Sequence, residues 1–483
     1  MGIFDRFRAT APSSTNGGKP DTSGQDATRL IDEGHVLEAE GKLDEAMQCY
    51  LDAIRLAPNL ARAHLNHGNV LLLKGDLKGA LDAFSAAIIY QPDYAGAYYN
   101  IGNALLNDGK LDEAVASFRR ALEIQPEYAE VHCSLGVALK ELGQMEDAIA
   151  CFRRALEINP DLVEAHLNLG SSFLSQGRYA EGWPEYETRY DPRYSGRQSF
   201  PPDLPFPQWQ GQPLDGKSIM VWPEQGFGDE IQFARYFPML KAMNVSYLTL
   251  VSKTPLKALM EQVEGVDKVI LVSEAASLPP HDYWTFPLSF PRHFATTVET
   301  IPSHLPYLSV PLERLNRWRT HIPKNGPTVG LVWKGNMAPN PHRSLPDLLT
   351  LAKLWSVPGI NFISLQKGLG EEEAATPPTG QPILNLGSDI QDFADTAAIV
   401  TQLDLVICID TAIAHLVGAL NIPCWVLLPA IGADWRWLQE RMDSPWYPGV
   451  MRLFRQTKSG DWSATIDDVA QSLKSWVDER KQF

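Results

Sequence analysis

The chain has 483 residues, of which 44% are apolar and 21% are charged. This composition is typical of ordered globular proteins and excludes collagen-like, coiled-coil and wholly disordered chains. At ~150 residues a domain, the length predicts about three domains. The net charge of −16 excludes a nucleic-acid binder that relies on bulk positive charge.

The five cysteines and the hydropathy pattern bear on the cellular compartment. Their number is odd and no Cys-x-x-Cys pair occurs, which predicts a reducing compartment and buried thiols rather than disulfides or metal sites. The most apolar stretch, 403–420, is interrupted by Asp404, Asp410 and His415, so it does not have the pattern of a membrane span. We expect a cytoplasmic protein without a membrane-spanning segment, signal peptide or bound metal.

The first third of the chain is a tail followed by a repeat. Residues 1–26 are predicted to be a disordered tail, because Ser, Thr, Gly, Pro and Asp dominate 9–25 and bury too little apolar surface to order it. Five columns then recur every 34 residues, a period typical of helical hairpin arrays: Pro58, Pro92, Pro126 and Pro160; Gly34, Gly68, Gly102, Gly136 and Gly170; Gly41, Gly75, Gly109, Gly143 and Gly177; Ala46, Ala80, Ala114 and Ala148; and Tyr50, Phe84, Phe118, Phe152 and Tyr186.

These columns resemble the tetratricopeptide repeat, with four full copies and a partial fifth over residues 27–190. The resemblance implies an α-solenoid whose concave face holds an extended peptide. On the predicted first helices, Asn66, Asn100 and Asn168 share one column, and their carboxamides suit a peptide backbone. The column resembles the asparagine ladder of O-linked N-acetylglucosamine transferases. The alternative is that these side chains are satisfied locally or by water.

Residues 191–216 are predicted to be a linker, because six prolines exclude a helix over most of it. A Walker A match at 211–218 lies across its end. A phosphate-binding loop must follow a strand and open a helix, whereas this segment follows a proline-rich linker and precedes a strand-like run. The match is therefore predicted not to be a phosphate-binding loop.

Beyond the linker, short β-rich runs alternate with helical ones, which predicts parallel sheets covered by helices. The expected strands of a first half, 217–325, and a second half, 326–483, are 218–222, 247–251, 268–272, 283–286, 328–333, 361–365, 403–409 and 423–428. An amphipathic helix at 466–481 closes the chain. The predicted fold class is a helical solenoid followed by two Rossmann-like, doubly wound α/β domains facing a cleft.

The first candidate site is the loop that contains Gly226, Gly228 and Asp229. The glycines allow close backbone approach, but Ile231 stands where a dinucleotide fingerprint has its third glycine, which disfavours a nicotinamide enzyme. Asp229 is either a general base at the cleft or a helix N-cap. The adjacent Glu230 either raises the pKa of Asp229 or faces water.

Cationic and amide side chains follow two predicted strands of the second half. Lys334 and Arg343 suit a diphosphate, although each alone is more often a solvated surface cation. Gln366 and Lys367 end the next strand, at the same expected edge, with the same alternative.

The sharpest local pattern is Asp410 and Thr411, followed by His415 on the same helix face. A strand that runs into this helix start presents free N–H groups and a dipole, a ready phosphate site. Alternatively, Asp410 caps the helix and His415 is a buried polar residue. Two tryptophans in the loop 434–437 either stack on a nucleobase or pack the junction between the halves.

Together, the Gly-Asp loop, the Trp-Lys-Gly-Asn segment with its downstream Arg-Ser, and Asp-Thr-Ala-Ile-Ala-His-Leu resemble the heptosyltransferase-like glycosyltransferase family nine. Bacterial proteins that join tetratricopeptide repeats to this domain have the same layout. The resemblance implies a GT-B fold with a nucleotide-diphosphate-sugar donor on the second half, an acceptor on the first, and no cofactor or metal. It also implies inversion with Asp229 as base, a diphosphate motif formed by Asp410, Thr411 and His415, and Arg343 as the phosphate-binding cation.

We therefore expect an enzyme that glycosylates a protein or peptide held by the repeats, with surface-appendage proteins such as flagellin among the targets that the resemblance suggests. One alternative is a transferase for lipopolysaccharide or another glycan, with the repeats serving assembly. Another is a scaffold with a catalytically silent transferase domain.

Overall fold

The computed structural model describes residues 22–277, 279–336 and 341–480. These residues form two compact units. The first runs up to Ser172 and includes Asp191–Gly196, and the second comprises Phe173–Tyr190 and the residues from Arg197 onward. This division differs from the predicted boundary at residue 190, because the last helical segment before that residue packs into the second unit.

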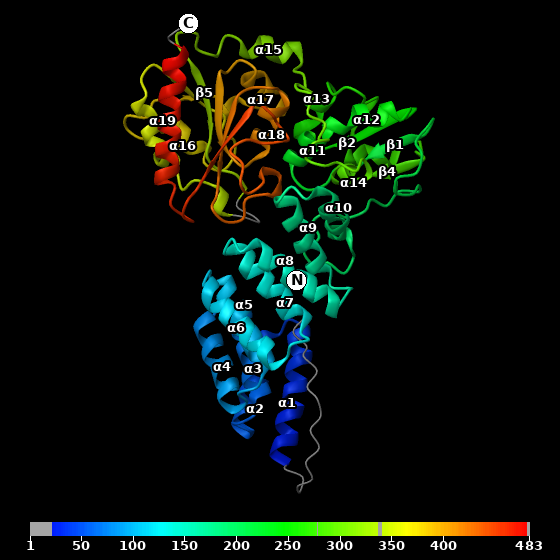
Figure 1. The fold of residues 1–483 in the computed structure, drawn as a ribbon, viewed down its shortest axis with the longest axis vertical. Helices are drawn as coiled ribbons and strands as arrows, with labels where there is room; N and C mark the ends of the chain where they lie inside the picture. Colours follow the sequence, from blue (N-terminus) through cyan, green and yellow to red (C-terminus); the bar gives the residue numbers. More distant parts are fainter. Residues whose placement is uncertain (1–21, 278, 337–340, 481–483) are drawn as a thin grey trace. The chain divides into compact units, whose positions relative to one another are not determined.

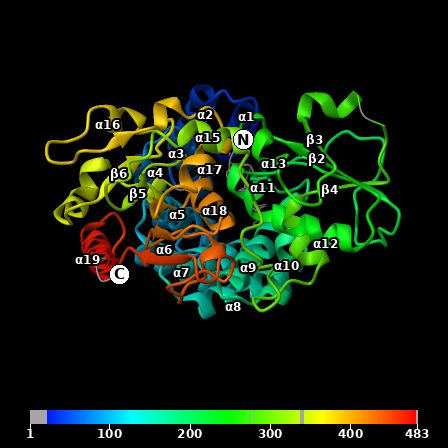
Figure 2. The same cartoon turned by 90° about the horizontal axis from the view of Figure 1, so that it is seen from above.

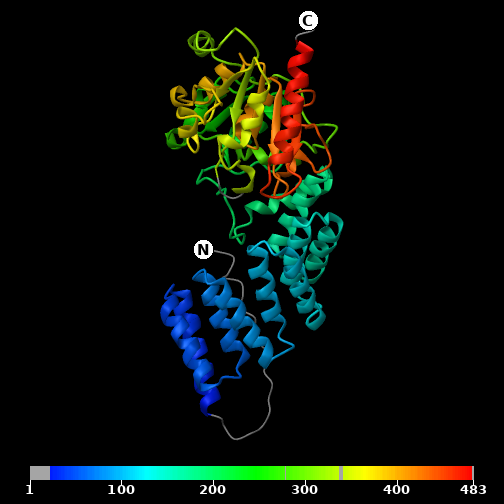
Figure 3. The ribbon, with the colours of Figure 1, turned by 90° about the vertical axis from the view of Figure 1, so that its left-hand side faces the viewer.

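The first unit is an array of helical hairpins (Figures 1 and 3). Its helices are α1 (Thr22–Ala39), α2 (Leu43–Leu56), α3 (Ala61–Leu73), α4 (Leu77–Tyr90), α5 (Ala95–Asn107), α6 (Leu111–Ile124), α7 (Ala129–Glu141), α8 (Met145–Ile158) and most of α9 (Val163–Ser175). Residues 1–21 of the predicted tail lie outside the described residues, and residues 22–26 are helical. Buried Ala27 and Ile31 anchor α1, and the turn before them continues the same helix.

The glycine and aromatic columns explain how each hairpin closes. A Cβ on Gly102 of α5 would lie 2.4 Å from the Phe118 ring of α6, and one on Gly68 would lie 2.5 Å from Phe84. Only a residue without a side chain lets the two helices approach this closely. The second glycine column ends the first helix of each hairpin, where Gly75 has φ +82° and Gly109 φ +75°, the left-handed conformation of a helix C-terminus.

The Gly102→Ala variant is expected to lower the free energy of unfolding of the first unit by about 1–3 kcal/mol, since the added methyl group overpacks against Phe118. The matched control is Gly96→Ala on the same helix, where the new methyl meets nothing closer than 3.5 Å and is expected to stabilise by up to about 1 kcal/mol. Urea unfolding followed by far-UV circular dichroism measures both. Equal losses in the two variants would contradict the packing explanation.

The second unit contains two sheets in which all strand pairs are parallel. The first sheet has the order β3-β2-β1-β4, and the second β10-β9-β8-β5-β6-β7. The strands are β1 (Ser218–Val221), β2 (Tyr247–Ser252), β3 (Lys268–Leu271), β4 (Tyr283–Thr285), β5 (Thr328–Val332), β6 (Asn361–Ser364), β7 (Leu384–Asn385), β8 (Leu405–Ile409), β9 (Cys424–Leu428) and β10 (Met451–Arg455). These sheets confirm the α/β character predicted for this part of the chain.

The order of the strands marks where ligands bind. In the first sheet β1 lies between β2 and β4, and in the second β5 lies between β8 and β6. The chain therefore continues to opposite sides of β1 and of β5, and doubly wound sheets bind ligands beyond the carboxyl ends of strands at such switch points. The loops after β1, β5 and β8 lie at these carboxyl ends.

Helices cover both faces of the second sheet (Figure 2). On one face, α19 (Ser463–Arg480) and the 3₁₀ helix η8 (Leu348–Ser356) share a core cluster with β5, β8 and β9. On the other, α17 (Phe393–Val400) and α18 (Ala412–Ala419) belong to the cluster that extends into the first sheet. The remaining helices are α10 (Tyr179–Tyr186), α11 (Phe227–Phe233), α12 (Phe237–Ala242), α13 (Lys257–Met260), α14 (Phe290–His293), α15 (Leu312–Trp318) and α16 (Glu371–Ala375).

Some elements differ from the sequence prediction. Strands β7 and β10 were not predicted, because β7 has two residues and β10 alternates apolar residues with Arg452 and Arg455 at the sheet edge. The closing helix begins at Ser463 rather than at residue 466. Part of the predicted linker adds to the first sheet, since the Trp209 N–H donates to the Trp284 carbonyl over 2.7 Å. The Walker-like segment leads into β1 and not into a helix.

Helix α10 joins the second unit through aromatic packing. Trp183 lies 5.2 Å from Trp435 between ring centroids, and the Trp446 indole N–H donates to the Tyr179 hydroxyl over 2.9 Å. Burial of such large rings stabilises the contact strongly. Among the described residues, no helix combines the length and hydropathy that crossing a bilayer requires.

Candidate functional site

The loop after β1 places Asp229 at the start of α11. Gly226 is the N-cap residue and Asp229 is the third residue of the helix. The Gly226 N–H donates to Asp229 Oδ2 over 2.8 Å, so the carboxylate caps the helix start without being its N-cap residue. Asp229 Oδ1 forms an ion pair with Arg436. Both carboxylate oxygens therefore have partners.

Burial raises the pKa of Asp229 above its usual range, and Asp434 raises it further. The Arg436 guanidinium, the Gly226 N–H and Lys253 act in the opposite direction. The side chain keeps 13% of its surface exposed. A carboxylate of raised basicity with some access to solvent suits a general base.

Gly228 brings the two halves of the second unit together at this point. A Cβ on Gly228 would lie 2.8 Å from His415 Cδ2 and 3.4 Å from the Cα of Ala412, both in α18. A side chain at this position would force the helices apart. The structure thus places Gly226, Gly228 and Asp229 beside the helix that follows β8 (Figure 1).

The start of α18 is suited to an anion. Thr411 is its N-cap residue in an extended conformation, and its side chain makes no capping hydrogen bond. Instead, its Oγ1 donates to the Ile409 carbonyl over 3.4 Å. The first amides of the helix consequently have no side-chain cap, and the helix dipole favours a negative charge there.

Asp410 and Arg343 lie next to this helix start. A Cβ on Gly335 would lie 2.9 Å from Thr411 Cγ2 and 3.8 Å from Arg343 Nε. The guanidinium of Arg343 donates to the Asn336 carbonyl over 2.8 Å through Nη2. Burial, followed by Asp434, raises the pKa of Asp410 above its usual range, although Trp437 and Arg343 lower it. The structure therefore brings Asp410, Thr411 and Arg343 together.

The ammonium of Lys334 has a different partner. Lys334 Nζ forms an ion pair with Glu373, whose carboxylate also accepts from the Trp333 indole N–H over 2.9 Å. A neutralised lysine contributes little charge to a neighbouring ligand. Lys334 is thus paired with Glu373 in this structure, and its contact with a diphosphate stays a prediction.

Gln366 and Lys367 also have other partners. Buried Gln366 accepts from the backbone N–H groups of Trp333 and Lys334 and donates to the carbonyls of Lys334 and Leu369. Its amide thereby shapes the loop after β5. Lys367 is half exposed, donates to the Ser388 carbonyl over 3.4 Å and lies 3.7 Å from Glu371. The sequence pattern could not reveal these partners, which tertiary packing selects.

His415 is buried and uncharged. Burial, together with Arg436 and Arg235, lowers its pKa well below the usual value. Its Nδ1 is hydrogen-bonded to the Tyr447 hydroxyl at 2.9 Å, and its ring stacks on Trp437 with centroids 5.4 Å apart. These contacts correspond to the alternative of a buried polar residue, and the lowered pKa favours the neutral imidazole.

The loop after β9 forms the 3₁₀ helix η10 (Trp435–Trp437). Both of its tryptophans are buried, so they pack the junction between the halves and do not present a free face to a nucleobase. Arg436 between them is the partner of Asp229. The sequence analysis assigns no role to Arg436, because no local pattern connects Arg436 to Asp229, which lies 207 positions away in the chain.

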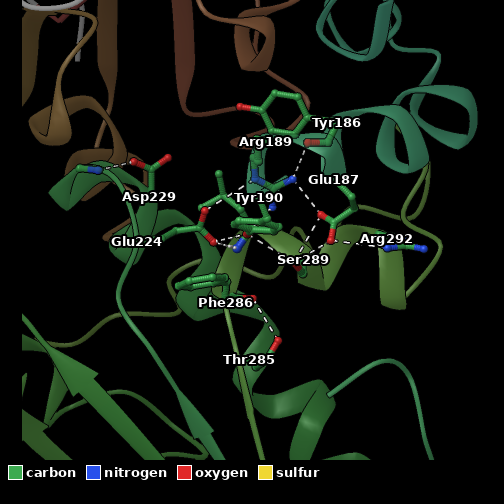
Figure 4. A network of polar contacts seen from close by, with 12 residues as sticks. Tyr186, Glu187, Arg189, Tyr190, Glu224, Asp229, Thr285, Phe286, Ser289 and Arg292 are labelled. Atoms are coloured by element: carbon green, nitrogen blue, oxygen red, sulfur yellow. Dashed lines mark hydrogen bonds and ion pairs between the residues drawn. The ribbon is translucent and has the colours of Figure 1, made fainter. Parts of the chain in front are cut away.

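A second buried carboxylate, Glu224, lies in the same loop as Asp229 (Figure 4). Burial raises its pKa to about 7. It accepts from the Tyr190 hydroxyl over 2.7 Å and from the Leu288 N–H over 3.1 Å, and Arg189 lies 3.7 Å away. Arg189 and Tyr190 belong to the 3₁₀ helix η2 (Glu187–Tyr190). The segment that follows α10 thus holds the loop that carries Asp229.

Glu230 does not face water. Its side chain is buried and accepts a hydrogen bond from the Ser252 hydroxyl, and burial raises its pKa to about 7. Of the two alternatives for Glu230, the one in which its side chain faces water is therefore wrong. Within the described part of the chain, no group of three or more His, Cys, Asp or Glu side chains is arranged to hold a metal ion.

The predicted asparagine column in the first unit has local partners. Asn66 Nδ2 lies 2.8 Å from His35 Nε2, and Asn100 Nδ2 donates to Asn69 Oδ1 over 2.7 Å. Asn168 Nδ2 lies 4.0 Å from the sulfur of Cys133. Asn66 and Asn100 are buried. The column therefore connects adjacent hairpins here, which favours local satisfaction over peptide binding.

Comparison with known proteins decides the nature of the array. A tetratricopeptide-repeat family model matches residues 34–75, 68–109, 102–143 and 138–177. Residues 34–177 form tetratricopeptide repeats. The crystal structures of MamA and of YrrB, described as a tetratricopeptide protein with an unusual peptide-binding site, are 22% and 24% identical to the chain. They cover 34% and 35% of it, and it covers 90% and 84% of them, with TM-scores of 0.30 and 0.28.

The sequence match to a curated relative extends beyond the tetratricopeptide repeats. Protein FlbA of Caulobacter vibrioides is 31% identical over 329 residues, which is 63% of this chain and 54% of that protein. The chain thus spans about half the length of this relative. Arrays of tetratricopeptide repeats form extended concave surfaces that can bind other proteins.

One column of the tetratricopeptide array escaped the sequence prediction. The ring nitrogen Nε2 of His64, His132 and His166 lies 2.8, 2.9 and 2.9 Å from the carbonyl oxygens of Pro58, Pro126 and Pro160, respectively. Each contact ties the first helix of a repeat to the turn before it. The sequence contains a signal for this column, because the three histidines are separated by multiples of the 34-residue repeat period.

Proposed function

We propose that the second unit is an inverting glycosyltransferase of GT-B architecture that uses a nucleotide-diphosphate sugar. The observation that carries this proposal is the meeting of two helix starts from different sheets: Gly228, next to Asp229 in the first turn of α11, packs against Ala412, the first residue of α18, whose N-cap side chain makes no capping hydrogen bond. A general base and an anion site at one place are what direct displacement at a sugar requires.

In the proposed reaction, Asp229 takes the proton of an acceptor hydroxyl as its oxygen attacks the anomeric carbon of the sugar. The bond between that carbon and the phosphate oxygen breaks, and the nucleoside diphosphate leaves with the electron pair. The amides at the start of α18 and the Arg343 guanidinium are suited to stabilise the leaving diphosphate. Attack opposite the leaving group inverts the anomeric carbon.

Burial raises the pKa of Asp410 above its usual range and so favours the protonated form of the carboxyl group. A protonated carboxyl donates a hydrogen bond to a phosphate oxygen, whereas a charged one repels it. We therefore assign Asp410 to diphosphate binding together with Thr411, and assign Lys334, Gln366 and Lys367 to the surrounding framework.

The acceptor in this proposal is a protein or peptide that the tetratricopeptide repeats hold. Tethering a partner to the same chain as the transferase raises its effective concentration at the active site without any new contact there. A glycan acceptor is the second enzyme possibility, with the repeats serving assembly.

A scaffold with a silent transferase domain is the second candidate function. The observation that favours it is that Asp229 forms an ion pair with Arg436, and Lys334 forms one with Glu373. Under this alternative, the ion pairs hold the domain together and no donor binds.

The proposed activity is tested by measuring the release of nucleoside diphosphate from a panel of nucleotide sugars, with water as the fallback acceptor and with purified flagellin as a probe protein. We expect release from at least one donor, increased by a competent acceptor. Absence of release from every donor, with and without the probe protein, would favour the scaffold.

A further inference from the structure

The guanidinium of Arg436 is the polar link between the proposed base and the second half of the unit. Its Nη2 pairs with Asp229 Oδ1, and its Nε donates to the Gln232 side chain. Its Nη1 donates to both carboxylate oxygens of Asp434, over 3.0 and 2.9 Å. Each of the three guanidinium nitrogens therefore donates a hydrogen bond. Two of these partners lie on α11 and the third belongs to the loop after β9.

The surroundings hold this fork in one orientation. The side chain of Arg436 is 6% exposed, and its guanidinium lies over the ring of Trp435 at 4.4 Å from the centroid. A planar fork stacked on an aromatic ring is more strictly oriented than an ammonium group. Asp434 and Trp435, which belong to the same loop as Arg436, thus hold the guanidinium in one orientation.

We infer that Arg436 is the positioning residue of the base: it orients the Asp229 carboxylate toward the acceptor and couples it to the loop after β9. This inference rests on the proposed function of Asp229. Arg436 belongs to the second half of the unit and contacts Asp229 and Gln232 of the first half.

The charge environment of Asp229 gives this role a measurable signature. From the loop after β9 it faces Arg436 and Asp434, and Lys253 faces it from the end of β2. In its own loop it is near Glu224. The imidazole of α18, on His415, is uncharged.

Of these groups, Arg436 is the cation in direct contact with the carboxylate. Its removal is therefore expected to raise the pKa of Asp229. A base must be deprotonated to act, so the acidic limb of the pH–rate profile moves to higher pH.

The test compares Arg436→Gln with Arg436→Lys in the full chain, using release of nucleoside diphosphate from the donor that the wild type turns over. For Arg436→Gln we expect kcat to fall at least about tenfold, KM for the donor to stay within about twofold, and the acidic limb to move up by about 1 pH unit. Arg436→Lys keeps the charge but not the fork, so the limb stays near its wild-type position while kcat remains reduced.

Two outcomes overturn the inference. A rise in donor KM with unchanged kcat would make Arg436 a donor-binding residue. A fall in kcat with an unmoved acidic limb in both variants would make its role purely structural.

A double-mutant cycle in urea unfolding, with Asp229→Asn, Arg436→Gln and the double variant, tests the pair without any catalysis. It therefore separates failure of this inference from failure of the proposed function. Positioning predicts that the two substitutions are coupled by at least about fivefold in the unfolding equilibrium constant, and that the double variant is the more stable of the two that lack Arg436. A coupling of zero overturns the inference, whether or not a donor is turned over.

Discussion

Asp229→Asn is expected to reduce the rate of sugar transfer by about 10²–10⁴-fold, the usual contribution of a positioned general base. The amide keeps the size of the side chain and its oxygen can still accept from the Gly226 N–H, so helix α11 retains its capped start. What the variant lacks is a group that can accept the proton of the acceptor hydroxyl. The initial rate of nucleoside diphosphate release at saturating donor measures the effect.

The matched control is Asp468→Asn, the same chemical change at an exposed position on α19. It is expected to leave the rate unchanged. Donor affinity of Asp229→Asn should stay near that of the wild type, because Asp410 and Thr411 are untouched. A rate within threefold of the wild type would show that Asp229 is not the base.

Glu224→Gln is expected to change how the stability of the second unit depends on pH. Burial raises the pKa of Glu224 from 4.5 to about 7 in the folded state. Between these two pH values the unfolded chain releases the proton while the folded chain keeps it. The contribution of Glu224 to stability is therefore complete below pH 4.5 and is lost as the pH rises through 7. Glutamine stays neutral throughout.

Relative to the wild type, the free energy of unfolding of Glu224→Gln should therefore rise by about 3 kcal/mol between pH 4.5 and pH 8. Urea unfolding followed by tryptophan fluorescence isolates this unit, because the first of the 13 tryptophans is Trp183. The control is Glu313→Gln, whose side chain is 83% exposed and should show no such trend. A pH-independent difference between Glu224→Gln and the wild type would contradict a buried carboxyl with a raised pKa.

The repeats were predictable because their packing rules are local and periodic. A glycine such as Gly102 and an aromatic such as Phe118 recur in fixed register, and the structure shows why: a methyl group on the glycine would overlap the ring. The parallel strands were predictable from short buried runs such as β8. Strand β10 was not, because Arg452 and Arg455 interrupt its apolar pattern at a sheet edge where the arginines are tolerated.

The candidate site was predictable in position but not in its partners. The rule that ligands bind at the carboxyl ends of parallel strands places Asp229 and Asp410 in loops at such ends. No rule on the sequence states that Lys334 pairs with Glu373, that Glu224 meets η2, or that Arg436 reaches Asp229. These contacts join segments far apart in the chain, and packing of the folded core selects them. The roles of the site residues in catalysis stay predictions.

Calorimetric titration shows whether the start of α18 binds the diphosphate of a nucleotide sugar, as we propose. The wild type and Asp410→Ala are titrated with a panel of nucleoside diphosphates and nucleotide sugars, with Asp468→Ala as the exposed control. We predict micromolar binding of at least one nucleotide by the wild type and the control, weakened at least about tenfold in Asp410→Ala. No binding across the panel, or equal affinity of Asp410→Ala and the wild type, would contradict it.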